Sequence, residues 1–312
     1  MRKMNNLKVV STGKYLPKKV LTNSDFEKMV DTSDEWIYTR TGIKERHIVE
    51  GESTVDLAYH ASMNAIKKAN YDVNKIDLII VATCTPDRAT PSTANLLQAK
   101  LGLNNKDIPC FDLSAACTGF IYALDVAAQM LNSNSFNTAL VVGAERLSSV
   151  CDYTDRNTCV LFGDGAGAMI IENTKEKKDA YFFTASTGDD ELVLTVNGKI
   201  KMDGRKVYQF ATKAIETSIN KVLNDCSLTL NDIDKIISHQ ANIRILETSA
   251  KQLDVSMDKF FVNIEDYGNT SSASVIIALD EYLDTVTNKD GMKILFVAFG
   301  GGFTWGSALI TL

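Results

Sequence analysis

One cysteine in the chain stands where a thiol can act as a nucleophile. A strand-like run over residues 108–113 ends at small residues, and Cys117 then opens an apolar helical pattern over residues 117–131. At a helix N-terminus, unpaired backbone N–H groups and the positive end of the helix dipole favour a thiolate. We therefore expect Cys117 to be an activated nucleophile on a strand-to-helix turn. The alternative is a small buried apolar residue, which is the usual state of a free cysteine.

Two polar residues later in the chain are candidates for the same site. His239 comes at the end of a short apolar strand pattern, and chemistry in α/β proteins gathers at the carboxyl ends of strands. Asn269 precedes a second apolar helical pattern, over residues 271–282. The alternatives are a structural histidine with its hydrogen bonds satisfied, and a helix N-cap, a position that suits asparagine.

Three consecutive glycines, residues 300–302, follow the last strong strand pattern of the chain. Glycine lets a backbone N–H approach a substrate where a side chain would block it, so this segment predicts an oxyanion site. A phosphate-binding loop is a rival interpretation, but no Lys-Ser/Thr pair follows and no long helix starts there. A flexible turn is the third alternative.

The elements that must position these residues occur twice, in the same order. The motif Asn-x-Ile-Asp stands at residues 74–77 and again at residues 231–234, each time before an apolar strand and after a long helical pattern. A helix, a strand, a small-residue turn, an apolar helix and a strand ending in glycine then follow in both cases. We interpret this match as an internal duplication; chance agreement between two α/β patterns is the alternative.

The alternation of strands and helices predicts parallel sheets covered on both faces. Because the helix after Cys117 is almost wholly apolar, we expect it to be buried on all sides. The fold class is therefore α/β, in five layers ordered α/β/α/β/α. The predicted halves are residues 1–172, with the cysteine, and residues 173–312, with the histidine and asparagine.

Composition narrows the classes of function. The 312 residues are 45% hydrophobic and 23% charged, and the net charge of −6 argues against a nucleic-acid partner. The six cysteines include no C-x-x-C pair, and the three histidines argue against a multi-histidine metal site. No apolar run approaches the roughly 18 residues that a membrane span needs. We expect a cytoplasmic protein with no membrane partner and no metal.

Taken together, these segments resemble the β-ketoacyl-acyl-carrier-protein synthase III family of the thiolase superfamily. The resemblance rests on Cys117 in its alanine-rich turn and on the glycine-rich end of the chain. Further matching segments are residues 31–36 (DTSDEW), 39–43 (TRTGI), 45–48 (ERHI), 162–167 (FGDGAG), 239–242 (HQAN) and 268–271 (GNTS). Because they follow one another in the family's order over nearly the whole chain, the resemblance is specific.

The resemblance implies a triad of Cys117, His239 and Asn269. Cys117 would take an acyl group from acyl-CoA, and malonyl-acyl-carrier protein would then lose carbon dioxide and attack that thioester. His239 and Asn269 would hydrogen-bond the malonyl thioester carbonyl, while the N–H groups of Cys117 and Gly301 would form the other oxyanion hole. The implied protein initiates type II fatty-acid synthesis as a homodimer, with neither a metal nor an organic cofactor.

The resemblance also implies a set of residues that contact CoA or the carrier-protein arm. They are Thr32, Trp36, Arg40, Arg156, Asn242 and Arg244. A tryptophan face suits adenine and arginines suit phosphate groups. The alternatives are a core position for the tryptophan and surface ion pairs for the arginines. Thr32 also heads a capping-box pattern that opens a short helix, which Gly42 would end.

Some features depart from the family or concern its partners. Thr90 stands where some relatives carry a bulky aromatic that closes the acyl pocket across the dimer, so we expect room for longer or branched acyl groups. Residues 187–202, which border that pocket, form a shorter segment than in many relatives. For the dimer, residues 139–143 with residues 159–162 nearby offer apolar surface. For the carrier protein, we expect a basic patch of Arg244 and Lys251, extended by Lys201, Arg205 and Lys206.

Other functions remain open at this point. A starter-unit condensing enzyme or acyltransferase of a specialised-metabolite, polyketide-type pathway would use the same residues. A hydroxymethylglutaryl-CoA synthase also uses a cysteine and a histidine but needs a glutamate as acid and base, and Asn269 favours the condensing class instead. A non-catalytic binding homologue would keep the fold, although the intact triad argues against it.

Overall fold

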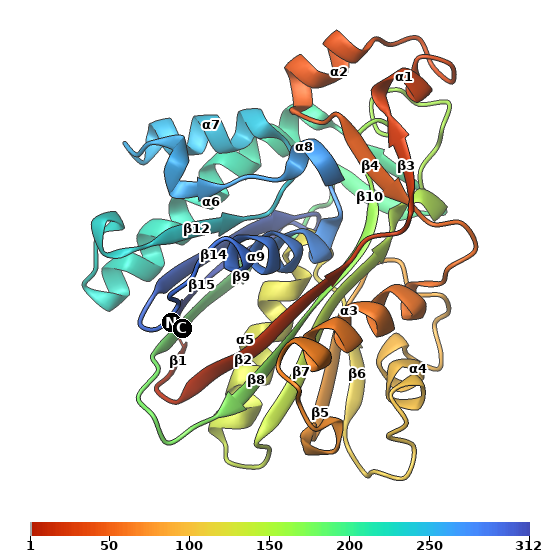
Figure 1. Cartoon of the computed structure of the whole chain (residues 1–312). Coiled ribbons are helices and arrows are strands. Elements are labelled where there is room, and N and C mark those ends of the chain that lie inside the picture. Colours follow the sequence, from red (N-terminus) through yellow and green to blue (C-terminus); the bar gives the residue numbers. More distant parts are fainter. Residues whose placement is uncertain (1) are drawn as a thin grey trace.

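Two large β-sheets and three helical layers form the body of the protein, whose computed structural model describes residues 2–312 (Figure 1). From one outer face to the other, the layers are α3 and α4, a five-stranded sheet, α5 and α9, a six-stranded sheet, and α6 and α7. These helices are α3 (Thr54–Lys68), α4 (Thr93–Lys100), α5 (Gly119–Asn132), α6 (Gly204–Cys226), α7 (Ile243–Gln252) and α9 (Ser274–Asp284). The predicted α/β/α/β/α architecture is confirmed.

The two sheets repeat one strand order. The first runs β2-β8-β7-β5-β6, and the second runs β9-β15-β14-β12-β13, with β1 added beside β9. In both orders the first two pairings are antiparallel and the last two are parallel. The strands are β1 (Arg2–Met4), β2 (Leu7–Tyr15), β5 (Leu78–Ala82), β6 (Cys110–Leu113), β7 (Thr138–Arg146), β8 (Asp164–Asn173), β9 (Ala180–Ser186), β12 (Lys235–Ser238), β13 (Phe260–Phe261), β14 (Lys293–Gly300) and β15 (Thr304–Thr311). This matched order is the internal duplication expected from the sequence.

The division of the chain at residues 172 and 173 stays a prediction. β8 ends at Asn173 and β9 begins at Ala180, so the predicted boundary cuts the last residue from a strand. β1 pairs with β9 and therefore belongs to the sheet of the second half. We propose that the boundary lies between β8 and β9, with β1 as an exchanged strand.

Side chains of the central strands alternate between two cores, as the two-residue period of a β-strand requires. On β5, Leu78, Ile80 and Ala82 face the core around α5 and α9, whereas Ile79 and Val81 face the core around α3. Because both faces of the sheet are covered, its strands read as continuous apolar runs. α5 lies between the two sheets, which confirms the predicted burial of the helix after Cys117.

Short elements outside the repeated pattern gather at one end of the molecule (Figure 1). They are α1 (Asn23–Phe26), α2 (Asp34–Thr41), β3 (Lys19–Thr22) and β4 (Glu45–Ile48). Gly42 ends α2 with a φ of +77°, as predicted, but the N-cap is Ser33, whose hydroxyl accepts a hydrogen bond from Trp36 N. The predicted capping box therefore lies one residue too early.

The remaining elements lie close to the cavities described below. β10 (Leu194–Asn197) and β11 (Lys199–Met202) form a hairpin, and α8 (Ile264–Tyr267) precedes Asn269. Six single turns of 3-10 helix complete the described chain: η1 (Val73–Lys75), η2 (Ala116–Thr118), η3 (Leu147–Ser149), η4 (Leu230–Asp232), η5 (Met257–Lys259) and η6 (Ser271–Ala273). None of the helices in residues 2–312 is both long and apolar enough to cross a bilayer.

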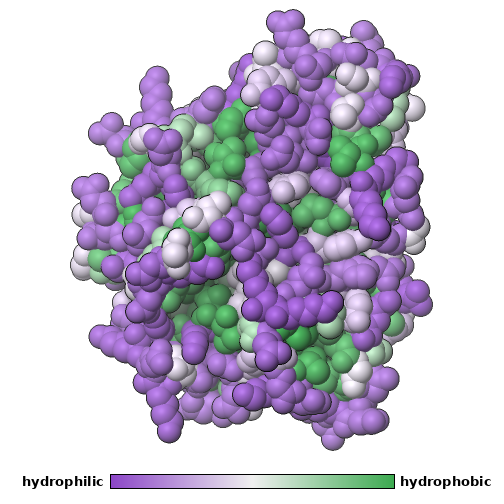
Figure 2. Space-filling model, viewed as in Figure 1, coloured by the Kyte–Doolittle hydropathy of each residue, from purple (hydrophilic) through white to green (hydrophobic). Residues whose placement is uncertain are grey.

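The surface location predicted for a dimer contact is wrong. Residues 138–145 of β7 are buried between β5 and β8, and Cys159, Val160 and Phe162 are buried as well. An apolar run marks a central strand as readily as an interface, which is why the sequence misleads here. The edge strand β6 is different, because all four of its residues are partly exposed. On the face shown in Figure 2, polar side chains dominate and apolar ones form separate patches.

Candidate active site

Cys117 lies in the turn between β6 and α5. The turn is η2, and α5 begins at Gly119, so Cys117 precedes the helix rather than opening it. Ala116 adopts a φ of +46°, a left-handed conformation that turns the chain sharply. A Cβ on Gly300 would lie 2.7 Å from Cys117 N, so only glycine lets the end of β14 approach this turn.

The pKa of Cys117 shifts in the direction opposite to the sequence-based expectation. Burial raises it to about 12, and a hydrogen bond with Ser271 offsets only part of that shift. Loss of hydration disfavours the thiolate more than the N–H groups of the turn favour it. With this pKa, the free protein holds Cys117 as a thiol at neutral pH.

His239 follows β12 and is 1% exposed, with its ring edge-on to Phe299 at 5.2 Å between centroids. Nδ1 lies 2.7 Å from Ser274 Oγ, and the same oxygen accepts a hydrogen bond from Gln240 N. We assign the hydroxyl hydrogen to Nδ1, which makes Nε2 the N–H donor of the ring. Burial lowers the pKa of His239 to about 3, so the ring is neutral at physiological pH.

Asn269 is held by its backbone and by one end of its amide. Its backbone N donates to Leu161 O at 2.9 Å, and its carbonyl oxygen accepts from Gly163 N at 3.0 Å. Its Oδ1 accepts a hydrogen bond from Ser271 N at 2.8 Å, but the N-cap of η6 is Thr270 and that of α9 is Ala273, so Asn269 is not the helix N-cap of the alternative interpretation. Because the amide oxygen is engaged, the Nδ2 amino group remains as the donor for a molecule in the cavity.

Two cavities meet at Cys117. The larger, of about 510 Å³, is lined by Trp36, Arg40, His239 and Asn269, among others, and the smaller has about 260 Å³. Cys117, Leu194 and Phe162 line both cavities, and Gly300 and Gly301 line one each. The β10–β11 hairpin contributes to both walls, as expected for the short segment of residues 187–202. A group carried by Cys117 can therefore extend into one space while a second molecule approaches through the other.

The larger cavity brings together six of the predicted site residues. They are Trp36, Arg40, Cys117, His239, Asn242 and Asn269. Gly301 lines only the smaller cavity. Arg244 lies beside the first set, in a groove between α2 and α7, where its Nε donates to Thr39 O at 3.0 Å. Thr32, Thr90 and Arg156 line neither of the two cavities.

Cationic side chains surround the Trp36 ring. Arg40 Cζ lies 4.5 Å and Arg156 Cζ lies 5.1 Å from the ring centroid. Arg156 Nη1 also donates to Asp31 O at 2.6 Å, so a backbone contact orients the guanidinium as well. The Thr32 hydroxyl is buried without a hydrogen-bond partner among the described residues. Trp36 and Arg156 are partly exposed, so Trp36 is not a core residue, and Arg40 is exposed.

Sequence reasoning missed a buried carboxyl group at the end of β7. Glu145 is 0% exposed and accepts hydrogen bonds from Ser272 Oγ at 2.6 Å, Thr85 Oγ1 at 2.6 Å and Cys84 N at 3.1 Å. Burial raises the pKa of Glu145. It lines neither cavity, so it is not placed as the acid and base of a hydroxymethylglutaryl-CoA synthase. The signal was its position as the only carboxyl group in an apolar strand.

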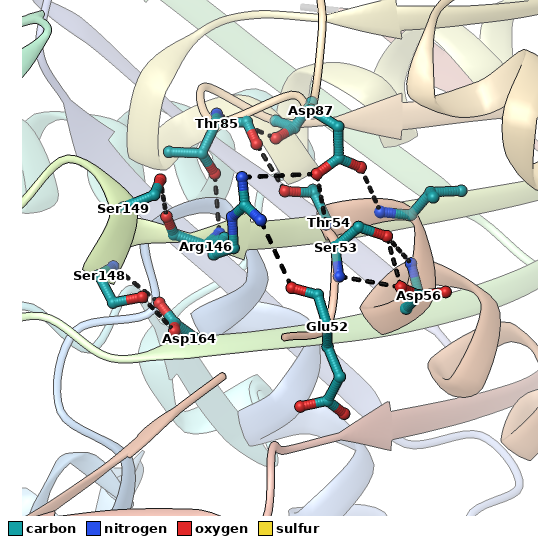
Figure 3. Close-up of polar contacts among 12 residues, drawn as sticks. Glu52, Ser53, Thr54, Asp56, Thr85, Asp87, Arg146, Ser148, Ser149 and Asp164 are labelled. Carbon is teal, nitrogen blue, oxygen red and sulfur yellow. Dashed lines mark hydrogen bonds and ion pairs between the residues drawn. The ribbon is translucent and has the colours of Figure 1, made fainter. Parts of the chain in front are cut away.

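A polar network fixes the loops at this edge of the first sheet (Figure 3). Asp87 accepts hydrogen bonds from Thr54 N at 2.9 Å and Val55 N at 3.0 Å, which caps α3. Arg146 Nη2 lies 3.7 Å from Asp87, and its Nη1 donates to Glu52 O at 3.5 Å. These contacts join the ends of β5 and β7 to the start of α3.

The fold, with a cysteine where two cavities meet, defines a thiolase-fold condensing enzyme, which is an acyltransferase. Residues 111–190 match the family model described as 3-oxoacyl-[acyl-carrier-protein (ACP)] synthase III, and residues 223–312 match the model of its C-terminal part. The chain belongs to the β-ketoacyl-acyl-carrier-protein synthase III family. No cluster of three or more His, Cys, Asp or Glu side chains arranged for a metal occurs in residues 2–312.

Relatives match over nearly the full length. The β-ketoacyl-[acyl-carrier-protein] synthase III of Acholeplasma laidlawii is 51% identical over 312 residues, covering 99% of this chain and 100% of the relative. The crystal structure of the synthase III from Aquifex aeolicus has a TM-score of 0.95 and 46% identity, covering 98% and 100%. The priming β-ketosynthase of the R1128 polyketide pathway has a TM-score of 0.93 but 32% identity, covering 98% and 96%. The identities favour the synthase III function over polyketide priming.

Proposed function

We propose that the protein condenses an acyl-CoA starter with malonyl-acyl-carrier protein to give a β-ketoacyl-acyl-carrier protein, in two steps at Cys117. The observation that carries this proposal is the position of Cys117 where the two cavities meet, with His239 and Asn269 on the wall of the larger one. The smaller cavity would hold the acyl chain, and the larger would admit the pantetheine arm of each substrate in turn.

In the first step, the Cys117 thiol attacks the thioester carbonyl of acyl-CoA. A bond forms between Sγ and the acyl carbon, the bond from that carbon to the CoA sulfur breaks, and the thiol proton ends on CoA. The N–H groups of Cys117 and Gly301 stabilise the oxyanion that develops. The close approach of Gly300 to Cys117 N supports this role, because it brings the glycine segment beside the nucleophile.

In the second step, malonyl-acyl-carrier protein loses its carboxylate as carbon dioxide, and the electron pair forms an enolate. His239 Nε2 and Asn269 Nδ2 donate hydrogen bonds to the enolate oxygen, which lowers the barrier to decarboxylation. The enolate carbon then bonds to the acyl carbon, the Sγ–acyl bond breaks, and the Cys117 thiolate that leaves takes up one proton from solvent to restore the thiol. Neutral donors suit this chemistry, since departure of carbon dioxide makes the carbanion without a strong base; the low pKa of His239 supports a neutral ring.

The mouth of the larger cavity would bind the CoA nucleotide. Trp36 offers a face for adenine, and Arg40, Arg156 and Arg244 offer charge for phosphates, with Thr32 and Asn242 assisting. Binding would require Arg156 to exchange its contact with Asp31 for one with the ligand. The unpartnered Thr32 hydroxyl supports a polar contact there.

We also propose a homodimer in the cytoplasm. The edge strand β6 carries Cys110, Phe111 and Leu113, each partly exposed, and a second copy would extend the first sheet through this edge. Thr90, which is exposed, would then reach the partner's acyl pocket. The carrier protein would dock on Arg244 and Lys251. Of the predicted extension to this patch, Lys206 is engaged by an ion pair with Glu191.

The test is the intact mass of the protein after exposure to a panel of acyl-CoAs, beside Cys117→Ala. We expect an acyl adduct on the unchanged protein and none on the variant, and the best-loaded acyl group names the starter. Absence of an adduct from every acyl-CoA would contradict the CoA-dependent first step. For the acyl pocket, Thr90→Phe should shift loading toward shorter acyl groups, and an unchanged preference would contradict its role.

A further inference from the structure

Arg46, on β4, is a buried arginine without an acidic partner. It is 0% exposed, and within the described chain its guanidinium bonds to no carboxylate. Its Nη1 donates to Asn23 Oδ1 at 2.7 Å, its Nη2 donates to Val160 O, and its Cζ lies 4.4 Å from the centre of the Phe26 ring. A buried charge with only neutral partners is unfavourable by itself, so this side chain calls for an explanation.

The contact with Val160 links two distant parts of the chain. Arg46 and Val160 are 114 positions apart, and the contact joins the β3–β4 hairpin to the segment after residue 159. Val160, Leu161 and Phe162 line the larger cavity. Arg46 itself lines neither the larger nor the smaller cavity.

The segment that Arg46 contacts, residues 160–163, pairs through its backbone with Asn269. Phe162 and Asn269 form an isolated β-bridge, in which Asn269 N donates to Leu161 O at 2.9 Å and Gly163 N donates to Asn269 O at 3.0 Å. Both backbone groups of Asn269 are therefore fixed by the residues that directly follow Val160. A displacement of this segment would move the amide with it.

The stem of Arg46 packs against both sides of the bridge. A Cβ on Gly163 would lie 3.2 Å from Arg46 Cβ and 2.5 Å from Tyr267 O. A Cβ on Gly268 would lie 3.4 Å from Arg46 Cβ and 2.9 Å from Leu161 O. Gly268, next to Asn269, and Gly163, next to Phe162, thus leave room for the side chain of Arg46.

We propose that Arg46 is a positioning residue for Asn269: its guanidinium anchors the Val160 carbonyl and its stem supports the β-bridge, so that the Asn269 amide points at the malonyl thioester. The inference rests on the proposed function, in which Asn269 acts only in the decarboxylation step. Acyl transfer to Cys117 uses the N–H groups of Cys117 and Gly301 instead, and no contact joins these to Arg46 in the described chain.

The two steps therefore separate this role from a general effect on folding. Arg46→Met keeps most of the stem and removes every donor. We expect decarboxylation of malonyl-acyl-carrier protein by the acylated enzyme to fall about 10- to 100-fold, because a small misplacement of a donor has effects of this size. Acylation of Cys117, followed by intact mass against time, should change by less than about twofold in the folded protein.

The chain offers a matched control in Arg146. Its Nε is also buried without a hydrogen-bond partner among the described residues, and one of its contacts is also to a backbone carbonyl. Its side chain contacts Glu52 O and Asp87 in the described chain, and neither residue belongs to the bridge at Asn269. Arg146→Met should therefore leave the ratio of the two rates unchanged. Arg46→Lys keeps the charge but cannot span both Asn23 and Val160, and we expect a decarboxylation loss of about 3- to 10-fold.

The outcomes distinguish the inference from the function beneath it. If Asn269→Ala leaves decarboxylation unchanged, the proposed role of Asn269 is wrong. If Asn269→Ala slows decarboxylation but Arg46→Met does not, or slows both steps equally, the positioning role is overturned. Should Arg46→Met fail to fold, the same comparison is made on Arg46→Lys, where an unchanged ratio of rates would equally overturn it.

Discussion

The turn before α5 and the turn before α9 have the same backbone but different surroundings. Each is a single 3-10 turn entered through a left-handed residue, Ala116 at a φ of +46° and Ser271 at +49°. Cys117 follows the first and lines both cavities, whereas Ser272 follows the second and is 0% exposed. The duplicated fold therefore contains two similar turns. Cys117 in the first turn lines both cavities, whereas the equivalent Ser272 in the second lines neither.

The facing strand explains the difference. At the first turn the neighbour is Gly300. Because glycine has no side chain, the end of β14 can approach the backbone of Cys117 closely. The second turn also faces a glycine, since a Cβ on Gly143 would lie 2.7 Å from Ser272 O, but Glu145, two residues further on, accepts a hydrogen bond from Ser272 Oγ at 2.6 Å. Both facing strands therefore provide a glycine, and the buried glutamate that hydrogen-bonds Ser272 is what distinguishes the second turn.

The largest expected effect comes from making the first turn chemically like the second. Cys117→Ser replaces a thiol with a hydroxyl that has no base beside it, since the His239 ring offers Nε2–H. We expect acylation by acyl-CoA to fall by about 10⁴-fold. The measurement is the rate of adduct formation by intact mass. Retention of more than a few per cent of the rate would mean that another group activates the hydroxyl.

A side chain on the facing strand should close the reactive turn. Gly300→Ala places a Cβ 2.7 Å from Cys117 N, so the turn has to shift. We expect acylation to fall about 100-fold, with a loss of about 1–3 kcal/mol in the free energy of unfolding. Gly188→Ala is the control, because a Cβ there meets nothing within 4 Å. Equal rates of acylation in the two variants would show that the close approach of Gly300 to Cys117 is not needed for the reaction.

The ionisation of the cysteine sharpens the comparison, because an activated thiolate and a buried thiol respond differently to pH. With a pKa of about 12, the thiolate fraction rises tenfold for each unit of pH throughout the range from 6 to 10. Alkylation of Cys117 by iodoacetamide should therefore accelerate about tenfold per unit without a plateau. Cys117→Ala corrects for the other thiols. A plateau of the alkylation rate below pH 8 would instead support the activated thiolate that the sequence predicts.

Ser274, at the start of α9, links the second turn to His239, and its substitution tests whether this contact matters for the reaction at Cys117. Ser274→Ala removes the hydroxyl that contacts His239 Nδ1 at 2.7 Å, so the ring no longer has a fixed tautomer. We expect decarboxylation to fall about tenfold, while acylation of Cys117 stays within about twofold. Equal losses in both steps would indicate a packing defect instead.

The smallest effect on activity should come from the second turn itself. Ser272→Ala removes a donor from buried Glu145 and should lower the free energy of unfolding by about 1–3 kcal/mol. Both half-reactions should stay within about twofold, since Ser272 lines neither cavity. Chemical denaturation and the two rate assays measure this. A selective loss of acylation would show that the second turn also acts in catalysis.

The repeated fold could be predicted because its signals are local. The two Asn-x-Ile-Asp motifs, strand periods and glycine ends recur in order, and Cys117, His239 and Asn269 follow strand ends that meet at one edge. Contacts between distant residues could not be predicted. Glu145 and Ser272 are 127 positions apart, and His239 and Ser274 are 35 positions apart. No local sequence pattern around one member of such a pair predicts the other.

Burial is nonlocal in the same way, and it accounts for two of the errors. Residues 139–143 are apolar because their strand is central to a sheet, which a single strand pattern cannot show. The thiol of Cys117 keeps its proton because of everything packed around it, whereas the sequence shows only the turn on which it stands.

The place of β15 in the second sheet has a consequence for how the chain folds during synthesis. β15 separates β9 from β14, and β1 is attached only to β9. A nascent chain can assemble its first sheet once β8 has left the ribosome, because all five of those strands lie before residue 174. The second sheet has to wait for residues 304–311, and until then β1 and β9 can pair only with each other and not with the rest of that sheet.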